Sequence, residues 1–212
     1  RNALRVDRVV RLHANDVAEF VSLGSGNWVC PAYIRGATIP LQTGTHTIFV
    51  PAVAMVARTT NGAASGTQES TTNDVMQRTF DFDQTTEEGV QFIVAMPKGW
   101  NNSTVTAQFL SFANGGTAGQ MMVWRIRAMA LSDHNAIDTA FGTARSITDS
   151  MTTTGLLHIS TTTAAITIGN TPAQSDLVVF EVLRDVTPDT LAADAKLWGV
   201  RLFYTLNAQN DA

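Results

Sequence analysis

The sequence predicts an all-β protein with a small amino-terminal β module over residues 1–40. A jelly-roll-like antiparallel β-sandwich that carries one short helix is expected over residues 41–212. Short apolar segments recur along the chain with turn-forming residues between them, which is typical of sandwiches and barrels. Threonine recurs in segments such as "STTTAAIT" and suits half-exposed strands. With 212 residues, of which 44% are hydrophobic, the chain can bury a substantial core.

The amino-terminal module is predicted from residues 6–36, which form three short apolar segments. Turns are expected at "HAND" (13–16) and at "GSGN" (24–27). The second turn predicts a hairpin, because glycine and asparagine tolerate the positive φ of a tight turn. Three short strands bury little, so we expect this module to need a neighbour. The segment "ATIPLQTG" (37–44) has no periodic pattern and marks the boundary.

The strands of the sandwich are predicted from alternating and continuous apolar runs. In "RTFDFD" (78–83), Phe80 and Phe82 face one side of the strand, and Asp81 and Asp83 face the other. Further strands are expected in 89–96, 103–112, 120–131, 156–159, 164–168, 176–185 and 196–206. The last two of these are long and strongly apolar, which indicates central strands.

One segment, "LSDHNAIDTAFG" (131–142), predicts a short helix. Ser132 or Asp133 would cap it and Gly142 would end it. Its apolar face would consist of Ala136, Ile137, Ala140 and Phe141.

Composition argues against several classes of protein. The net charge is −4, with 14 basic and 18 acidic residues scattered along the chain, so we expect no nucleic-acid partner. No apolar run approaches the roughly 20 residues of a membrane span. The single cysteine, Cys30, cannot form a disulfide within the chain and is expected to be a small buried residue.

The sequence lacks the familiar local motifs of catalytic and cofactor sites. The glycine-bearing stretch "RTTNGAASGT" (58–67) lacks the lysine of a phosphate-binding loop, so we interpret it as a surface connection to a strand that begins near Asn73. His13, His46 and His158 lack the spacing of a zinc site. We therefore predict no cofactor, no metal and no enzymatic activity, although an active site assembled from scattered residues remains an alternative.

Three residues are candidates for surface contacts. Asp81 and Asp83 project from one strand face and could hold a hard cation, but exposure to solvent or a salt bridge is the favoured interpretation. Trp100 lies in the turn-rich segment "MPKGWNNS" (96–103), where an exposed indole could stack on a sugar or contact a neighbouring subunit. The other large aromatic residues are expected in the core: Trp124, Trp198, Phe109, Phe112, Phe203 and Tyr204.

Two stretches carry a family resemblance. "DVAEFVSLGSGNWVCPAYIRG" (16–36) resembles a short β module of bacteriophage tail fibres. A second resemblance lies within residues 41–212, which are similar to a β-sandwich domain of tailed-phage structural proteins. It is carried by the blocks "TIFVPAVAMVARTTNGAASGT", "NDVMQRTFDFD", "QFIVAMPKGW", "LSDHNAIDTAFGTA" and "LWGVRLFYTLNAQNDA". This second resemblance implies no catalytic or ligand-binding residue.

The resemblance implies a non-enzymatic structural protein of a tailed-phage virion, most simply a tail-fibre or fibre-like surface component. Such proteins are usually homotrimers, so the expected partners are further copies of the chain, other virion proteins through the amino-terminal module, and a host surface glycan. A decoration or head-fibre protein of the capsid is the alternative. A glycan-binding module or a depolymerase is a further alternative, and the latter predicts carboxylates clustered in a groove.

Overall fold

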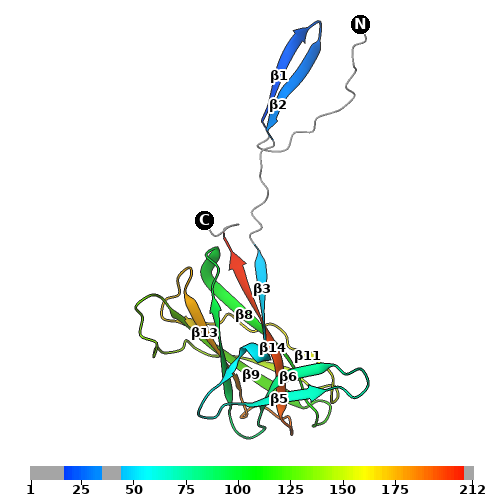
Figure 1. The fold of residues 1–212 in the computed structure, drawn as a ribbon, viewed down its shortest axis with the longest axis vertical. Helices are drawn as coiled ribbons and strands as arrows, with labels where there is room; N and C mark the ends of the chain where they lie inside the picture. Colours follow the sequence, from blue (N-terminus) through cyan, green and yellow to red (C-terminus); the bar gives the residue numbers. More distant parts are fainter. Residues whose placement is uncertain (1–16, 35–43, 208–212) are drawn as a thin grey trace. The chain divides into compact units, whose positions relative to one another are not determined.

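The computed structural model describes residues 17–34 and 44–207, and the chain divides into two compact units, Arg1–Gln42 and Thr43–Ala212 (Figure 1). Each unit is described by itself. The first strand predicted for the amino-terminal module, the "HAND" turn and most of the segment 37–44 lie outside the described residues. In the described part of the chain, no helix is long and apolar enough to cross a membrane.

The first unit contains an antiparallel hairpin of β1 (Val17–Gly24) and β2 (Asn27–Ile34). Ser25 and Gly26 form a two-residue turn with φ of 53° and 80°. Positive φ at both central residues is the geometry of a type I′ turn, whose twist matches that of the flanking strands. The hairpin predicted at "GSGN" is therefore confirmed.

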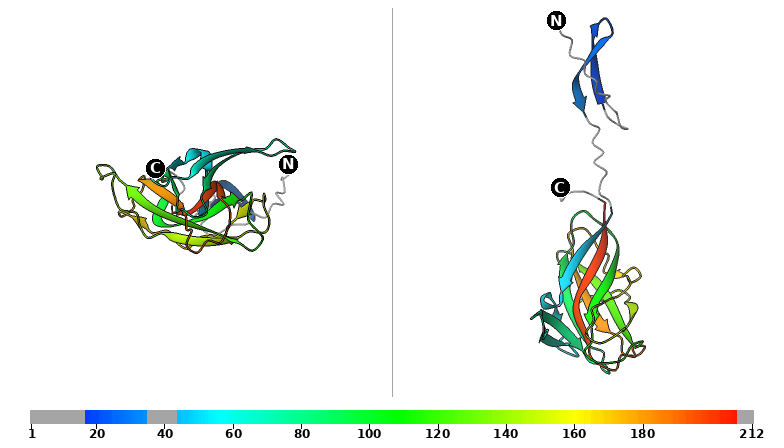
Figure 2. Two further views of the ribbon diagram at one scale, coloured as in Figure 1. Left: turned by 90° about the horizontal axis from the view of Figure 1, so that it is seen from below. Right: turned by 90° about the vertical axis from the view of Figure 1, so that its right-hand side faces the viewer.

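The second unit is a sandwich of two six-stranded sheets (Figures 1 and 2). The β14 sheet has the order β11-β8-β14-β6-β5, with β3 also paired to β14. The β13 sheet has the order β10-β9-β13-β7-β4, with β12 also paired to β9, in parallel. The strands are β3 (Thr45–Pro51), β4 (Val56–Ala57), β5 (Ala64–Glu69), β6 (Met76–Phe82), β7 (Gly89–Ala95), β8 (Trp100–Phe112), β9 (Met121–Leu131), β10 (Arg145–Ser150), β11 (His158–Ile159), β12 (Ile168–Gly169), β13 (Leu177–Arg184) and β14 (Ala195–Leu206).

The predicted antiparallel, jelly-roll-like β-sandwich is confirmed. Its long strands alternate between the sheets: β6 and β8 lie in one, β7 and β9 in the other, and the chain then passes from β13 to β14. β13 lies between β7 and β9, and β14 lies between β8 on one edge and β3 and β6 on the other, so both are central strands as predicted.

The core between the sheets is built around aromatic side chains. Phe80 and Phe82 point into it, as the alternation in "RTFDFD" predicts. Trp124 is fully buried, with the ring of Phe82 at 5.1 Å edge-on and the ring of Phe109 stacked at 5.7 Å. Such pairs add roughly 0.5–1.5 kcal/mol each to the burial of apolar area, so this cluster contributes to sheet-to-sheet packing.

The helix predicted in 131–142 is wrong, because this segment is an irregular loop. The hydroxyl of Ser132 does not cap a helix but donates to Asp176 Oδ1 at 2.7 Å. His134 has φ of 64°, which interrupts any right-handed turn, and Ile137 is 82% exposed rather than packed. Among the described residues, the helical element is a single 3₁₀ turn, η1 (Ala52–Ala54).

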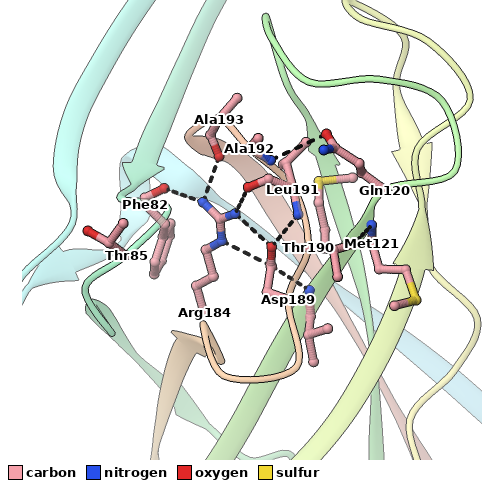
Figure 3. A network of polar contacts seen from close by, with 12 residues as sticks. Phe82, Thr85, Gln120, Met121, Arg184, Asp189, Thr190, Leu191, Ala192 and Ala193 are labelled. Carbon is pink, nitrogen blue, oxygen red and sulfur yellow. Dashed lines mark hydrogen bonds and ion pairs between the residues drawn. The ribbon is translucent and has the colours of Figure 1, made fainter.

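A buried arginine closes one end of the sandwich (Figure 3). Arg184 is fully buried at the end of β13, and its side chain makes five hydrogen bonds. Two reach the carboxylate of Asp189, at 3.0 and 2.8 Å. The others reach the carbonyl oxygens of Phe82, Leu191 and Ala193, at 2.8–2.9 Å. Since a guanidinium has five N–H donors, every one is satisfied.

We expect Arg184→Met to lower the free energy of unfolding by about 3–5 kcal/mol, because it leaves the carboxylate of Asp189 buried without its cation. Urea unfolding measures this. The double variant Arg184→Met/Asp189→Leu should lose less than the sum of the two single variants, since the two residues act as one unit. The control Arg78→Met removes an exposed arginine that contacts Thr67 and should change stability by no more than about 0.5 kcal/mol. Additive losses would contradict this coupling.

Candidate functional site

The structure places Trp100 in the core, so the prediction of an exposed indole at this position is wrong. Trp100 is 0% exposed and its Nε1 has no hydrogen-bond partner. The reason is that the "GWNNS" stretch begins the long strand β8, and Trp100 pairs with Leu206 of β14. Trp100 is therefore not a surface contact for a sugar or a subunit.

Asp81 lies on the outer face of β6 and forms an ion pair with Lys196 of β14. Thr79 Oγ1 donates a further hydrogen bond to Asp81 Oδ1 at 2.6 Å. Both oxygens of the carboxylate thus have a partner within the sheet. Asp81 therefore forms a salt bridge, which is one of the roles predicted for it from the sequence.

Asp83 lies just beyond β6 and organises a turn. Its Oδ1 accepts hydrogen bonds from the backbone N–H and hydroxyl of Thr85 and from the backbone N–H of Thr86, each at 2.7 Å. These bonds, those from Thr85 above all, lower the pKa of Asp83 to about 2. In the described residues no group of three or more His, Cys, Asp or Glu side chains is placed to hold a metal ion.

A cavity of about 320 Å³ opens on the outer face of the β14 sheet, and we call it the aromatic–amide groove. It is lined by Gln68, Gln77, Phe112, Asn114, Leu157 and Trp198. Glu69, Ser70 and Thr71 contribute to the same lining. The lining comes from β5, β6, the end of β8, β14 and the segment before β11, so the groove crosses adjacent strands of one sheet.

Two aromatic rings contribute to the lining of the groove. Trp198 and Phe112 meet edge to face, with ring centroids 6.4 Å apart and planes at 82°. The pairing of β14 with β8 shifts register between Leu197 and Gly199, so Trp198 occupies a bulge. A bulge re-aims a side chain, which explains why a residue of a central strand lies half-buried at the surface.

Amide side chains supply the polar part of the groove. Asn114 Nδ2 donates to Gln68 Oε1 at 2.7 Å, which fixes both amides. Gln77 Oε1 is buried and has no hydrogen-bond partner. Buried acceptors without a partner are rare in folded proteins, because each costs about 1–3 kcal/mol. One residue of the groove lining thus carries an acceptor whose hydrogen-bonding capacity is unused within the protein.

The sequence assigned Trp198 to the core and gave no role to the three amides. One local signal was present: Gly199 follows Trp198 within an apolar strand, and glycine inside a strand often marks a bulge. The amides come together only through strand pairing, in which Gln68 of β5 is opposite Gln77 of β6.

A second cavity, of about 690 Å³, adjoins the "RTTNG" segment. It is lined by Ala57, Arg58, Thr59, Thr60, Asn61, Glu87 and Gln91. Arg58 contacts Glu181 Oε1 at 3.5 Å and donates to the carbonyl of Asn61 at 3.3 Å, so its charge is used within the protein. The surface connection predicted for 58–67 is shorter than expected, because β5 begins at Ala64 and pairs with β6.

A buried acid and a histidine meet where the edges of the two sheets approach each other. His158 Nδ1 of β11 lies 3.9 Å from Asp149 Oδ2 of β10. Burial raises the pKa of Asp149, and the nearby His158 opposes this shift. Neither residue lines the aromatic–amide groove or the Arg58 cavity.

Comparison with known proteins gives no family. No family model matches the chain, and no curated protein matches it. Solved structures with a similar fold include the CBM36-1 domain of a multidomain xylanase from the hindgut metagenome of Trinervitermes trinervoides, with 13% identity, coverage of 74% of this chain and 96% of that chain, and a TM-score of 0.38.

The family 11 carbohydrate-binding module from Clostridium thermocellum, in complex with a beta-1,3-1,4-mixed-linked tetrasaccharide, has 9% identity, coverage of 74% and 94%, and a TM-score of 0.41. A non-crystalline cellulose specific carbohydrate-binding module, CBM28, has 11% identity, coverage of 74% and 86%, and a TM-score of 0.37. These scores are too low to indicate a ligand for this chain.

We expect Asp83→Ala to destabilise the protein at neutral pH, because the turn loses its acceptor. A carboxyl group whose pKa falls on folding stabilises the native state above its unfolded pKa, near 3.8, and loses that effect as the pH falls toward about 2. The difference in urea midpoint between wild type and Asp83→Ala should therefore narrow between about pH 4 and pH 2. Asp83→Asn keeps an acceptor oxygen, so its urea midpoint at neutral pH should lie between those of wild type and Asp83→Ala. A difference independent of pH would contradict this role.

Proposed function

We propose that the chain is a non-enzymatic structural protein of a tailed-phage virion, a tail-fibre or fibre-like surface component. In this proposal the β1–β2 hairpin joins three copies of the chain, and the sandwich faces outward and contacts the host. The observation that carries the proposal is the exposed apolar surface of the hairpin. The resemblance of 16–36 and of the sandwich to phage structural proteins supports the same assignment.

The hairpin exposes an unusual amount of apolar surface. Its exposed large side chains are Phe20 (48%), Val21 (41%), Leu23 (68%), Trp28 (65%) and Val29 (43%). Within the described residues, β1 and β2 pair only with each other, so each strand has an unpaired edge. A two-stranded hairpin is marginal alone in water, and an apolar patch of this kind indicates a contact surface. Identical chains can cover it symmetrically.

The sandwich supports the outward role. Its core is complete within residues 44–207 and needs no partner to bury it. The described lining of the aromatic–amide groove holds one carboxylate, that of Glu69, whereas glycoside hydrolysis ordinarily uses two. At this groove, the single carboxylate favours binding without hydrolysis over the depolymerase alternative.

A capsid decoration or head-fibre protein remains the second candidate, because the hairpin could equally attach the sandwich to the shell. Antibody raised against residues 41–212 and coupled to gold separates the two on intact virions. We expect gold at the tail fibres or tail tip. Gold spread over the head would instead assign the chain to the capsid, and the absence of gold on intact particles would contradict a virion role.

We expect the intact chain to sediment as a trimer at micromolar concentration, because association of three hairpins would bury their exposed apolar side chains. The double variant Leu23→Ser/Trp28→Ser should shift the chain to monomer in sedimentation equilibrium. Ile137→Ser, which removes an 82% exposed apolar side chain from the sandwich, is the matched control and should leave the trimer intact. A wild-type monomer or dimer would contradict association of three hairpins.

A further inference from the structure

We propose that the aromatic–amide groove binds a neutral saccharide chain. This proposal names a ligand class and a site, and it holds whether or not the protein belongs to a virion. The groove lies wholly within the sandwich and uses no residue of the hairpin.

The apolar half of the site is an ordered aromatic platform. The half-buried indole of Trp198 is held by the ring of Phe112, so binding need not order it and loses little side-chain entropy. A sugar ring presents C–H groups on its faces, and these pack on the apolar body of an indole. Leu157, which is 47% exposed, adds apolar surface to the same lining.

The polar half of the site suits hydroxyl groups. A carboxamide carries two N–H donors and one carbonyl acceptor, and a sugar hydroxyl both donates and accepts. The hydrogen bond between the amides of Asn114 and Gln68 uses one N–H of Asn114 and the carbonyl oxygen of Gln68. The NH₂ group of Gln68 can therefore still donate to a ligand, and the carbonyl oxygen of Asn114 can still accept from one. Gln77 Oε1 is buried without a partner, so a ligand hydroxyl would satisfy it once the partly exposed Gln77 side chain turns toward the groove.

The charge and extent of the groove define the ligand class. Glu69 is the only charged residue in the described lining, so the groove has no cation for a uronate or phosphate group and would repel one. The lining spans β8, β14, β6 and β5, which are four adjacent strands and cover roughly 14 Å at ordinary strand spacing. That width fits a chain of sugars better than a single ring.

Affinity electrophoresis of the full chain tests the proposal. Native gels would contain a mixed-linkage β-glucan, a galactomannan or a dextran, and alginate as the anionic comparison. We expect retardation by at least one neutral polysaccharide and none by alginate. Trp198→Ala should weaken that binding about tenfold, and Gln77→Ala about threefold to tenfold, the effect of one lost hydrogen bond.

Matched controls lie outside the groove. Ile93→Ala removes a 64% exposed apolar side chain from β7 of the other sheet, and Gln84→Ala removes an exposed amide; both should bind like wild type. If Trp198→Ala does not fold, Trp198→Phe, which retains an aromatic ring, replaces it in the binding measurement. No retardation by any of the neutral polysaccharides, retardation by alginate alone, or wild-type binding by both Trp198→Ala and Gln77→Ala would overturn the proposal. Sedimentation of the same samples reports the trimer separately, so failure of one proposal is distinguished from failure of the other.

Discussion

The sandwich depends on one buried ion pair, that of Arg184 with Asp189. Burying a guanidinium is costly unless every donor finds an acceptor, and here all five do. The partners come from the end of β6, through the carbonyl of Phe82, and from the segment that leads into β14. Asp189 Oδ2 also accepts from the backbone N–H of Val123 in β9. One side chain thereby fixes the end of the β13 sheet, the end of β6 and the approach to β14, the strand to which β3, β6 and β8 all pair.

The fold could be predicted from sequence where its signals are local. Alternation in "RTFDFD" identified β6 and its inward face, and "GSGN" identified the hairpin turn, because both depend on residues within a few positions of one another. The helix expected in 131–142 failed for the opposite reason. Ser132 has the chemistry of a cap, but its hydroxyl bonds to Asp176, 44 residues further on, and no local pattern reveals that partner.

The candidate site was harder to predict because exposure depends on strand pairing. Trp100 and Trp198 both lie beside glycine, and the sequence suggested that the first was exposed and the second buried. The structure reverses them, since Trp100 begins a long paired strand while Trp198 occupies a bulge against β8. The bulge is a property of two strands that are far apart in the sequence, so the reversal follows from their register and from no property of either segment alone.

The outer faces of the two sheets carry different kinds of polar side chain, and this difference is the basis for proposing ligand binding on the β14 sheet. On the β13 sheet, the buried carboxylate of Glu181 is bound by Arg58, Gln91 and Arg127. Two arginines on one carboxylate leave this cluster with an excess of positive charge, and Arg58 Nε is buried without a hydrogen-bond partner. In the aromatic–amide groove the amides satisfy one another only in part, and Gln77 keeps a buried acceptor without a partner. Each cavity is therefore lined by a residue with a buried polar atom that lacks a partner, and the two cavities differ in chemistry. The larger Arg58 cavity presents charged groups, whereas the aromatic–amide groove presents neutral amides beside two aromatic rings, which suits a neutral saccharide.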